Sequence, residues 1–252
     1  MIKRIQLLLI ALVLPFISLA QTPDTLSQES PYKFKPKQLI APVALVGVGA
    51  IGSQIDAVKE FDFGFTKTHP KGIVAEDIIQ YVPAASYYIL NLSGVKPKHD
   101  YLDATVILAV SYGVTATATK LIKEMAGVQR PNGLDNKSFP SGHSSVAFMG
   151  AEFLRMEYKD SSPWIGIAGY AVATGTALAR IKHGEHWFTD VVAGAGVGIL
   201  GTQVSYWLYP WVQKLLFEKI FKCRTPHSKK VAFMTMPYCN GQGGGVSMAM
   251  RF

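Results

Sequence analysis

Long apolar stretches separated by short polar segments dominate the chain. Between residues 38 and 213, stretches free of Asp, Glu, Lys and Arg recur. They are too long for ordinary strands and too apolar for surface helices of a soluble domain. A helix needs about 20 mostly apolar residues to cross a bilayer. Val191–Gln213 meets this length and Ser161–Ala179 nearly does, whereas the other stretches do so only if their polar ends reach the headgroups. The pattern predicts an all-α bundle of about five to six transmembrane helices, over Gln38–Ile55, Ile78–Val95, Ala104–Thr119, Ser138–Ala151, Ser161–Ala179 and Val191–Gln213.

Small residues and aromatic residues refine this prediction. Glycines and alanines between Gly194 and Gly198, and between Gly169 and Gly175, would let helices approach closely within lipid. Tyr206, Trp207, Tyr209 and Trp211 end the last stretch and a basic segment follows, which is typical of a helix leaving the membrane on the cytoplasmic side. A soluble helical bundle with unusually apolar core helices is the alternative, and a mean hydropathy of +0.20 leaves it open.

The two ends of the chain differ from this central part. Lys3 and Arg4 precede an apolar run that ends with Ser18 and Ala20, a pattern that predicts a signal peptide over residues 1–20, with an uncleaved membrane anchor as the alternative. The remaining boundaries follow from composition: an exposed linker over 21–38, a helical domain over 39–210, a basic juxtamembrane segment over 211–230, and a Gly-rich tail over 231–252 that could form a β-hairpin. Because the tail ends in Phe252, an outer-membrane location is an alternative to the inner membrane.

Composition and charge exclude several classes of protein. The 252 residues are 49% hydrophobic and 17% charged, so the chain is neither disordered nor a small module. The net charge of +8 is concentrated between Trp211 and Lys230, without the basic stripe that a nucleic-acid-binding surface needs. Two cysteines, Cys223 and Cys239, are too few for a disulfide framework or a thiolate zinc site.

The chemistry is concentrated in three short blocks. Lys123, Arg130 and Arg180 are cations at the ends of apolar stretches, and Arg and Lys are the residues that bind phosphate oxygens. Ser141-Gly142 stands just before an expected helix, where free backbone N–H groups and the helix dipole also favour an anion. The blocks therefore predict a phosphate-binding pocket.

Two histidines could supply the catalysis. His186 and Asp190 are four residues apart at an expected helix start, so the carboxylate can hold one imidazole nitrogen and leave the other as a nucleophile. His143 could protonate the leaving oxygen and later deprotonate water. A metal site that includes His183 with Glu185 or Asp190 is the alternative, but three nearby cations would repel a divalent ion.

The three blocks resemble the signature of the type 2 phosphatidic acid phosphatases, which share a helical bundle with vanadium haloperoxidases and bacterial acid phosphatases. The signature reads Lys123 to Arg130-Pro131, then Pro140-Ser141-Gly142-His143, then Arg180 through His186 to Asp190, and Ala179 stands where the family usually has serine. The resemblance implies a metal-independent phosphatase that needs no cofactor and proceeds through a phosphohistidine. His186 would attack, with Asp190 orienting it and His143 as acid and base. The phosphate would be held by Lys123, Arg130, Ser141, Gly142 and Arg180.

Topology and substrate follow from the same positions. Both halves of the site must meet on one membrane face, so the four stretches after residue 100 are expected to alternate in direction and to leave Lys96–Lys98 and Arg155–Lys159 on the cytoplasmic side. Only one of the first two stretches should cross the membrane. We expect Gln38–Ile55 to cross it and Ile78–Val95 not to. Since every site residue falls at a helix end, the expected substrate is a lipid phosphate at headgroup depth, facing the periplasm at the bacterial inner membrane. Lipid A, undecaprenyl diphosphate, phosphatidylglycerol phosphate and phosphatidic acid are the candidates. The alternatives are a soluble acid phosphatase, a vanadate-dependent haloperoxidase and a non-catalytic lipid-binding protein.

Overall fold

The structure, a computed structural model, describes residues 36–59, 61, 64, 68, 72 and 74–215, together with the backbone of residues 232–240 and 243–251. The predicted signal peptide, most of the linker and the basic segment after residue 215 lie outside the described residues. The chain divides into two compact units, Met1–Tyr209 and Pro210–Phe252.

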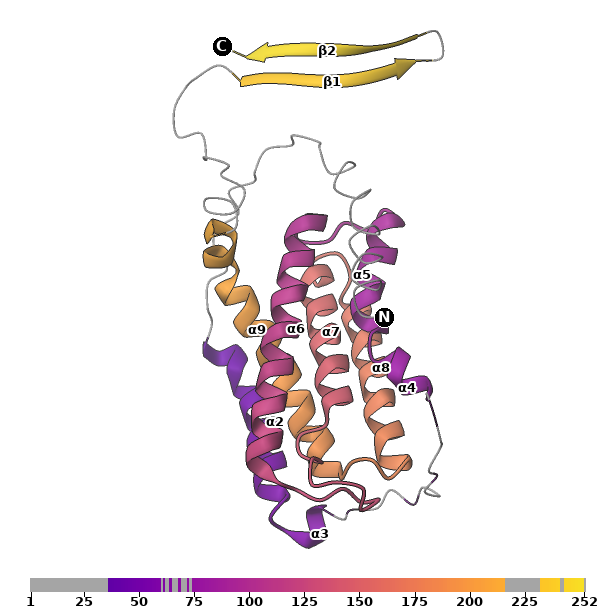
Figure 1. Cartoon of the computed structure of the whole chain (residues 1–252), viewed down its shortest axis with the longest axis vertical. Coiled ribbons are helices and arrows are strands. Elements are labelled where there is room, and N and C mark those ends of the chain that lie inside the picture. The colour runs from indigo at the N-terminus through magenta and orange to yellow at the C-terminus, as the bar shows by residue number, and fades with distance from the viewer. Residues whose placement is uncertain are drawn as a thin grey trace. The chain divides into compact units, whose positions relative to one another are not determined.

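The described part of the first unit is entirely helical, which confirms the predicted all-α bundle (Figure 1). Four long helices alternate in direction and form its body. Shorter helices precede them in the chain. In chain order the helices are η1 (Pro36–Leu39), α2 (Ile40–Gly52), α3 (Asp56–Lys59), α4 (Ala75–Ile79), α5 (Val82–Leu92), α6 (Tyr101–Ala126), α7 (Gly142–Tyr158), α8 (Pro163–Lys182) and α9 (Phe188–Leu215).

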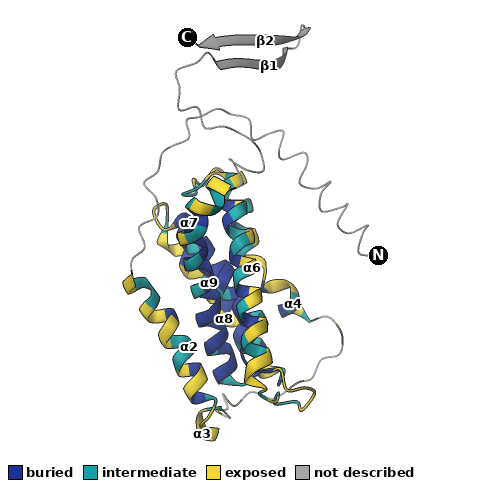
Figure 2. Cartoon of the chain, turned by 60° about the vertical axis from the view of Figure 1, so that its left-hand side comes forward, coloured by how far each residue is buried: buried dark blue, intermediate teal, exposed yellow. Residues whose placement is uncertain are grey.

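Helix α7 lies at the centre of the bundle and packs against α5, α6 and α8. Figure 2 shows that the buried residues gather on α7 and α9, whereas α2 and α6 keep exposed faces. The core includes Tyr87 of α5, Ile107 of α6 and Phe153 of α7, with Tyr158 and Tyr206 beside them. This arrangement places the amino end of α7, where the phosphate-binding motif stands, among three other helices.

Glycines on α9 permit its close approach to the neighbouring helices. A methyl group built on Gly198 would overlap the carbonyl oxygen of Ser145, and one on Gly194 would stand 2.6 Å from that of Ser141. On another face of the helix, Gly196 meets Pro42 of α2 in the same way. These are the small residues that the sequence singled out, and they bring α9 into backbone contact with α7 and α2.

A buried polar network closes the opposite end of the bundle. The carboxylate of Glu157 accepts hydrogen bonds from the backbone N–H of His99, at 2.9 Å, and from the hydroxyl of Tyr206, and it lies 2.7 Å from the His99 ring. The backbone N–H of Lys98 donates to the carbonyl of Glu157 at 2.8 Å. The loop with Lys96 and Lys98 and the carboxyl end of α7 therefore share one end of the molecule.

Two of the described helices, α6 and α9, are long and apolar enough to cross a membrane. Helix α6 extends beyond the predicted stretch to Ala126, so that Lys123 falls in its last turn. Large apolar side chains are exposed on the outer faces of several helices, among them Ile51, Ile89, Leu121 and Trp164. Soluble monomers rarely expose apolar surface on this scale, so the pattern favours contact with lipid.

The second unit contains an antiparallel pair of strands, β1 (Ala232–Asn240) and β2 (Gly243–Arg251). Their register pairs Ala232 with Arg251 and Asn240 with Gly243. This pairing agrees with the β-hairpin that the sequence suggested for the tail.

Candidate active site

The signature residues converge at one end of the bundle. They come from the carboxyl ends of α6 and α8, the amino ends of α7 and α9, and the loops between them, which all lie at the lower end of Figure 1. Because successive long helices are antiparallel, a carboxyl end and the next amino end meet on the same side. The sequence expectation that the three blocks form one site agrees with this geometry.

His186 lies in a tight turn before α9, rather than in the helix as the sequence suggested. Gly184 takes a left-handed conformation, with φ of 67°, that lets the chain turn from α8 into α9. His186 is 3% exposed and Asp190 is fully buried. The Asp190 carboxylate lies 3.5 Å from His186 Nδ1 and is held by the backbone N–H of Trp187 at 2.8 Å.

Ser138 is a third member of this group, which the sequence patterns did not reveal. Its hydroxyl donates a hydrogen bond to Asp190 Oδ2 and lies 3.5 Å from His186 Nδ1. The serine stands two residues before Pro140, and its place next to the Pro-Ser-Gly-His block is the signal that could have revealed it. Asp190 and Ser138 together fix the Nδ1 side of the ring, so Nε2 is the nitrogen left for chemistry.

The environment keeps the His186 imidazole neutral. Burial lowers the pKa of His186 to about 4, and the positive charges of Lys123 and Arg130 act in the same direction, against the opposing effect of Asp190. A neutral imidazole has a lone pair, which a nucleophile needs. Burial therefore keeps this ring unprotonated at neutral pH, and the cations that would bind a phosphate add to the effect.

Two of the predicted phosphate-binding cations, Lys123 and Arg130, contact acceptors in the neighbouring loops. Lys123 Nζ donates to the backbone carbonyl of Lys137 at 2.6 Å. Arg130 contacts Asp135 at 2.8 Å and Glu185 at 2.5 Å. The Asp135 carboxylate accepts hydrogen bonds from Arg130 and from the backbone N–H of Lys137. The bond from Lys137 lowers the pKa of this carboxyl most, ahead of the contact with Arg130. The loop before α7 is thus held in contact with both Lys123 and Arg130.

Arg180 is buried, and its two carboxylate partners also contact other site residues. It contacts Glu76 of α4 and Glu185, each at 3.3 Å, so that Glu185 links Arg130 to Arg180. Its Nε is buried and has no hydrogen-bond partner among the described residues. An unsatisfied buried guanidinium N–H is costly, and a bound oxyanion would satisfy it.

Ser141 and Gly142 begin α7 and play different parts. The backbone N–H of Ser141 donates to the carbonyl of Asp190 at 3.0 Å, and its hydroxyl accepts from Ser144 N–H at 3.4 Å as the helix cap. Ser141 is therefore engaged in fixing the two halves of the site together. In the described part of the chain, the N–H groups of Gly142 and His143 have no acceptor, so they are the ones left for an anion. A methyl group added at Gly142 would meet no protein atom within 4 Å.

His143 and His183 contact residues that the sequence patterns did not connect with them. His143 Nε2 lies 2.8 Å from Asp77 of α4, and His183 Nδ1 lies 2.5 Å from Glu76. His183 therefore pairs with Glu76 of α4. Among the residues that the structure describes, no group of three or more His, Cys, Asp or Glu side chains is placed to hold a metal ion.

Comparison with known proteins agrees with these motifs. Residues 104–214 match the PAP2 superfamily. A lipid A 1-phosphatase of Porphyromonas gingivalis is 45% identical over 155 residues, covering 61% of this chain and 34% of that protein. A PA-phosphatase related-family protein of Dictyostelium discoideum is 27% identical over 168 residues, covering 57% of this chain and 59% of that protein. The crystal structure of Aquifex aeolicus LpxE has 20% sequence identity and a TM-score of 0.41, with 52% of this chain and 82% of that chain covered.

The matched segment holds all three blocks of the signature, and the chain spans about a third of the length of its Porphyromonas relative. The motifs predicted the family from ten specified positions in fixed order. The geometry brings those positions to one end of a helical bundle, and the segment 104–214 that contains them is similar to the PAP2 superfamily.

Proposed function

We propose that this protein is a membrane lipid phosphatase that works without a metal ion and through a phosphohistidine on His186. The observation that carries the proposal is the buried, neutral His186 ring, fixed on its Nδ1 side by Asp190 and Ser138 and surrounded by phosphate-binding cations. Nucleophilic phosphoryl transfer needs an oriented nucleophile, a group that holds it, and positive charges that stabilise the phosphate. Here these are the imidazole, the carboxylate and the cations.

The first half of the reaction forms the phosphoenzyme. Lys123, Arg130 and Arg180 hold the phosphate oxygens, and the free N–H groups at the start of α7 add further donors. His186 Nε2 attacks phosphorus, so that an N–P bond forms while the ester P–O bond breaks. His143 gives its proton to the leaving oxygen, and Asp190 stabilises the positive charge that develops on the His186 ring.

The second half regenerates the enzyme. A water molecule attacks phosphorus, His143 takes its proton, and the N–P bond breaks with the electron pair returning to His186. Inorganic phosphate leaves, and Glu185 is then again the shared partner of Arg130 and Arg180. No step requires an electrophile other than the three cations.

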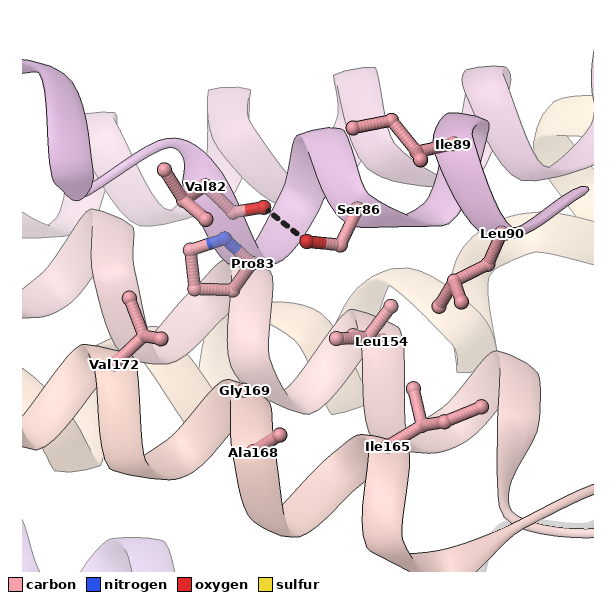
Figure 3. A pocket seen from close by; sticks show the side chains of 10 residues that line it. All are labelled: Val82, Pro83, Ser86, Ile89, Leu90, Leu154, Ile165, Ala168, Gly169 and Val172. Atoms are coloured by element: carbon pink, nitrogen blue, oxygen red, sulfur yellow. Dashed lines mark hydrogen bonds between the residues drawn. The ribbon is translucent and has the colours of Figure 1, made fainter. Parts of the chain in front are cut away.

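An apolar groove on the outside of the bundle supports a lipid as the substrate. It has a volume of about 270 Å³ and lies between the outer faces of α5 and α8, with Leu154 of α7 at its base. Figure 3 shows Val82 and Pro83 at one end and Ile165 and Leu90 at the other. Helix α5 begins only a few residues after Asp77, so the groove starts near the carboxylates of α4.

Among lipids, lipid A carrying a 1-phosphate is our first choice, because a relative that is 45% identical over 155 residues is a lipid A 1-phosphatase. Undecaprenyl diphosphate, phosphatidylglycerol phosphate and phosphatidic acid are the other substrates to compare. We further propose that the site faces the periplasm from the inner membrane, because the loops with Lys96, Lys98 and Lys159 lie at the opposite end, as the positive-inside tendency requires.

The test is a panel of substrates given to the detergent-purified protein in excess chelator. The four lipids in mixed micelles and a soluble ester, glucose 6-phosphate, are compared by kcat/KM for phosphate release. We expect release from lipids, with lipid A foremost, and inhibition by vanadate, which resembles the phosphoryl transition state. Loss of all activity in chelator with recovery on adding a divalent ion would contradict metal independence. A soluble ester that equals every lipid would favour the acid phosphatase, and peroxide-dependent halide oxidation with bound vanadate would favour the haloperoxidase.

A further inference from the structure

Helix α4 supplies two carboxylates to the site from outside the segment that matches the family. Residues 104–214 are the matched part, whereas α4 spans Ala75–Ile79. Glu76 is 3% exposed and contacts Arg180 and His183. Asp77, the next residue, contacts His143. The short helix therefore adds two acidic groups, which contact Arg180 and both His143 and His183, to the site.

The Asp77 carboxylate is fixed at both oxygens. Its Oδ2 accepts the backbone N–H of Val74 at 3.0 Å, which caps the first turn of α4, and its Oδ1 lies 2.8 Å from His143 Nε2. The bond from Val74 and then the contact with His143 lower the pKa of Asp77, so that it stays ionised. A carboxylate anchored in this way holds the imidazole in one orientation.

The charges around His143 explain what such a partner would do. The groups that face the ring are Asp77 and Glu76 of α4 and Arg180 of α8. Burial of the ring and then the nearby Arg180 disfavour the protonated imidazole, and the carboxylates of Asp77 and Glu76 favour it. A general acid must carry its proton when the substrate is bound, so a histidine among phosphate-binding arginines needs an opposing carboxylate.

We propose that Asp77 is a positioning residue for His143, forming a second imidazole–carboxylate pair alongside His186 and Asp190. The inference rests on the proposed function. Asp77 would hold the Nε2–H of the His143 imidazolium, so that Nδ1–H is the proton given to the leaving oxygen as the P–O bond breaks. After that transfer Asp77 still holds Nε2–H, and Nδ1 accepts a proton from the attacking water. Asp77 remains a carboxylate throughout, and no proton passes to it.

The test compares Asp77→Asn with the wild type, and with Asp160→Asn as a matched control. Asparagine keeps an oxygen that can cap Val74, so α4 should be retained while the charge is lost. Asp160 is an exposed aspartate at the opposite end of the bundle, in the turn between α7 and α8. Two substrates are used in chelator: lipid A, whose leaving group needs a proton, and p-nitrophenyl phosphate, whose leaving group hardly does.

We expect Asp77→Asn to lower kcat for lipid A by about 10- to 100-fold, which is less than the whole contribution of general acid catalysis because His143 itself is retained. The loss for p-nitrophenyl phosphate should be under about threefold, because a good leaving group needs little protonation. The fall of kcat at high pH should also begin at lower pH in Asp77→Asn, since the imidazolium loses its stabilising charge. Asp160→Asn should match the wild type in all three measurements.

Two results would overturn this role for Asp77. One is an Asp77→Asn variant as active as the wild type on lipid A. The other is an equal loss on both substrates with an unchanged pH profile, which would assign Asp77 to folding alone. A wild-type protein that releases phosphate from neither substrate would instead contradict the proposed function itself, and the role of Asp77 with it.

Discussion

At the scale of single residues, the position of Glu185 has a measurable consequence. Its carboxylate is the common partner of Arg130, at 2.5 Å, and Arg180, at 3.3 Å. A phosphate that binds these two arginines has to compete with it. We expect Glu185→Gln to bind vanadate about 3- to 30-fold more tightly, because removing the negative charge leaves the arginines available and removes repulsion of an anion, each effect being of the order of 1 kcal/mol. Inhibition constants for vanadate measure this directly. Weaker binding in the variant would show that Glu185 holds the arginines in place for the phosphate.

A second residue-scale prediction concerns the pH dependence of stability. The pKa of His186 is lowered to about 4 from the ordinary value of 6.5. Between these two values the unfolded chain binds the proton more readily, so stability is fully present above about pH 6.5 and is lost as the pH falls towards 4. The loss from this residue amounts to about 3 kcal/mol. Thermal unfolding in detergent should therefore show a steeper fall over this pH window in the wild type than in His186→Gln. Equal slopes in the two proteins would contradict a buried neutral imidazole.

The sequence could predict only those residues of the candidate site that belong to one of the three short motifs. Lys123, Arg130 and the residues around His143 and His186 have fixed spacings that indicate phosphate chemistry. Asp77 could not be found in this way, because it stands 66 residues from His143 and only the packing of α4 against the site brings them together. Glu76 is 104 residues from Arg180, and its burial likewise depends on tertiary structure. In the sequence these acids mark only the polar start of an apolar stretch.

At the scale of elements, the contact between α9 and α7 positions the start of α7. A methyl group at Gly198 would overlap the backbone of Ser145, whereas one at Gly113 of α6 would meet no protein atom within 4 Å. We expect Gly198→Ala to destabilise the protein by about 1–3 kcal/mol through overpacking. Gly113→Ala should be neutral or stabilising by up to about 1 kcal/mol, since alanine favours the helix. Thermal unfolding of the two variants in the same detergent provides the comparison. Equal stability of both variants would contradict the tight contact.

The helices themselves could be predicted more fully than their ends. The apolar stretches indicated α6 and α9, yet both helices run beyond the uncharged part, because charged residues such as Lys123 are tolerated in a last turn. The i, i+4 spacing of His186 and Asp190 suggested a helical pair. The glycine turn at Gly184 instead places His186 ahead of α9, which the spacing alone could not reveal.

At the scale of the whole molecule, the alternation of antiparallel helices decides where the chemistry can take place. Cations, histidines and the amino end of α7 lie at one end of the bundle, and the buried Glu157 network lies at the other, about 25 Å away along α7. Apolar side chains cover the outer faces between them. A lipid lying in the bilayer beside such a bundle would present its phosphate at the depth of the site, which lowers the entropic cost of the encounter.

If His186 carries the phosphate during turnover, the phosphoenzyme can be trapped and mapped. The purified protein is mixed with lipid A labelled in its 1-phosphate, quenched within the first turnover, and digested for peptide mapping. We expect an acid-labile phosphate on the peptide that contains His186. It should be absent from His186→Ala and longer-lived in His143→Ala, because the latter variant lacks the base that activates water. A phosphate mapped to another residue, or labelling of His186→Ala at the wild-type level, would contradict this role of His186.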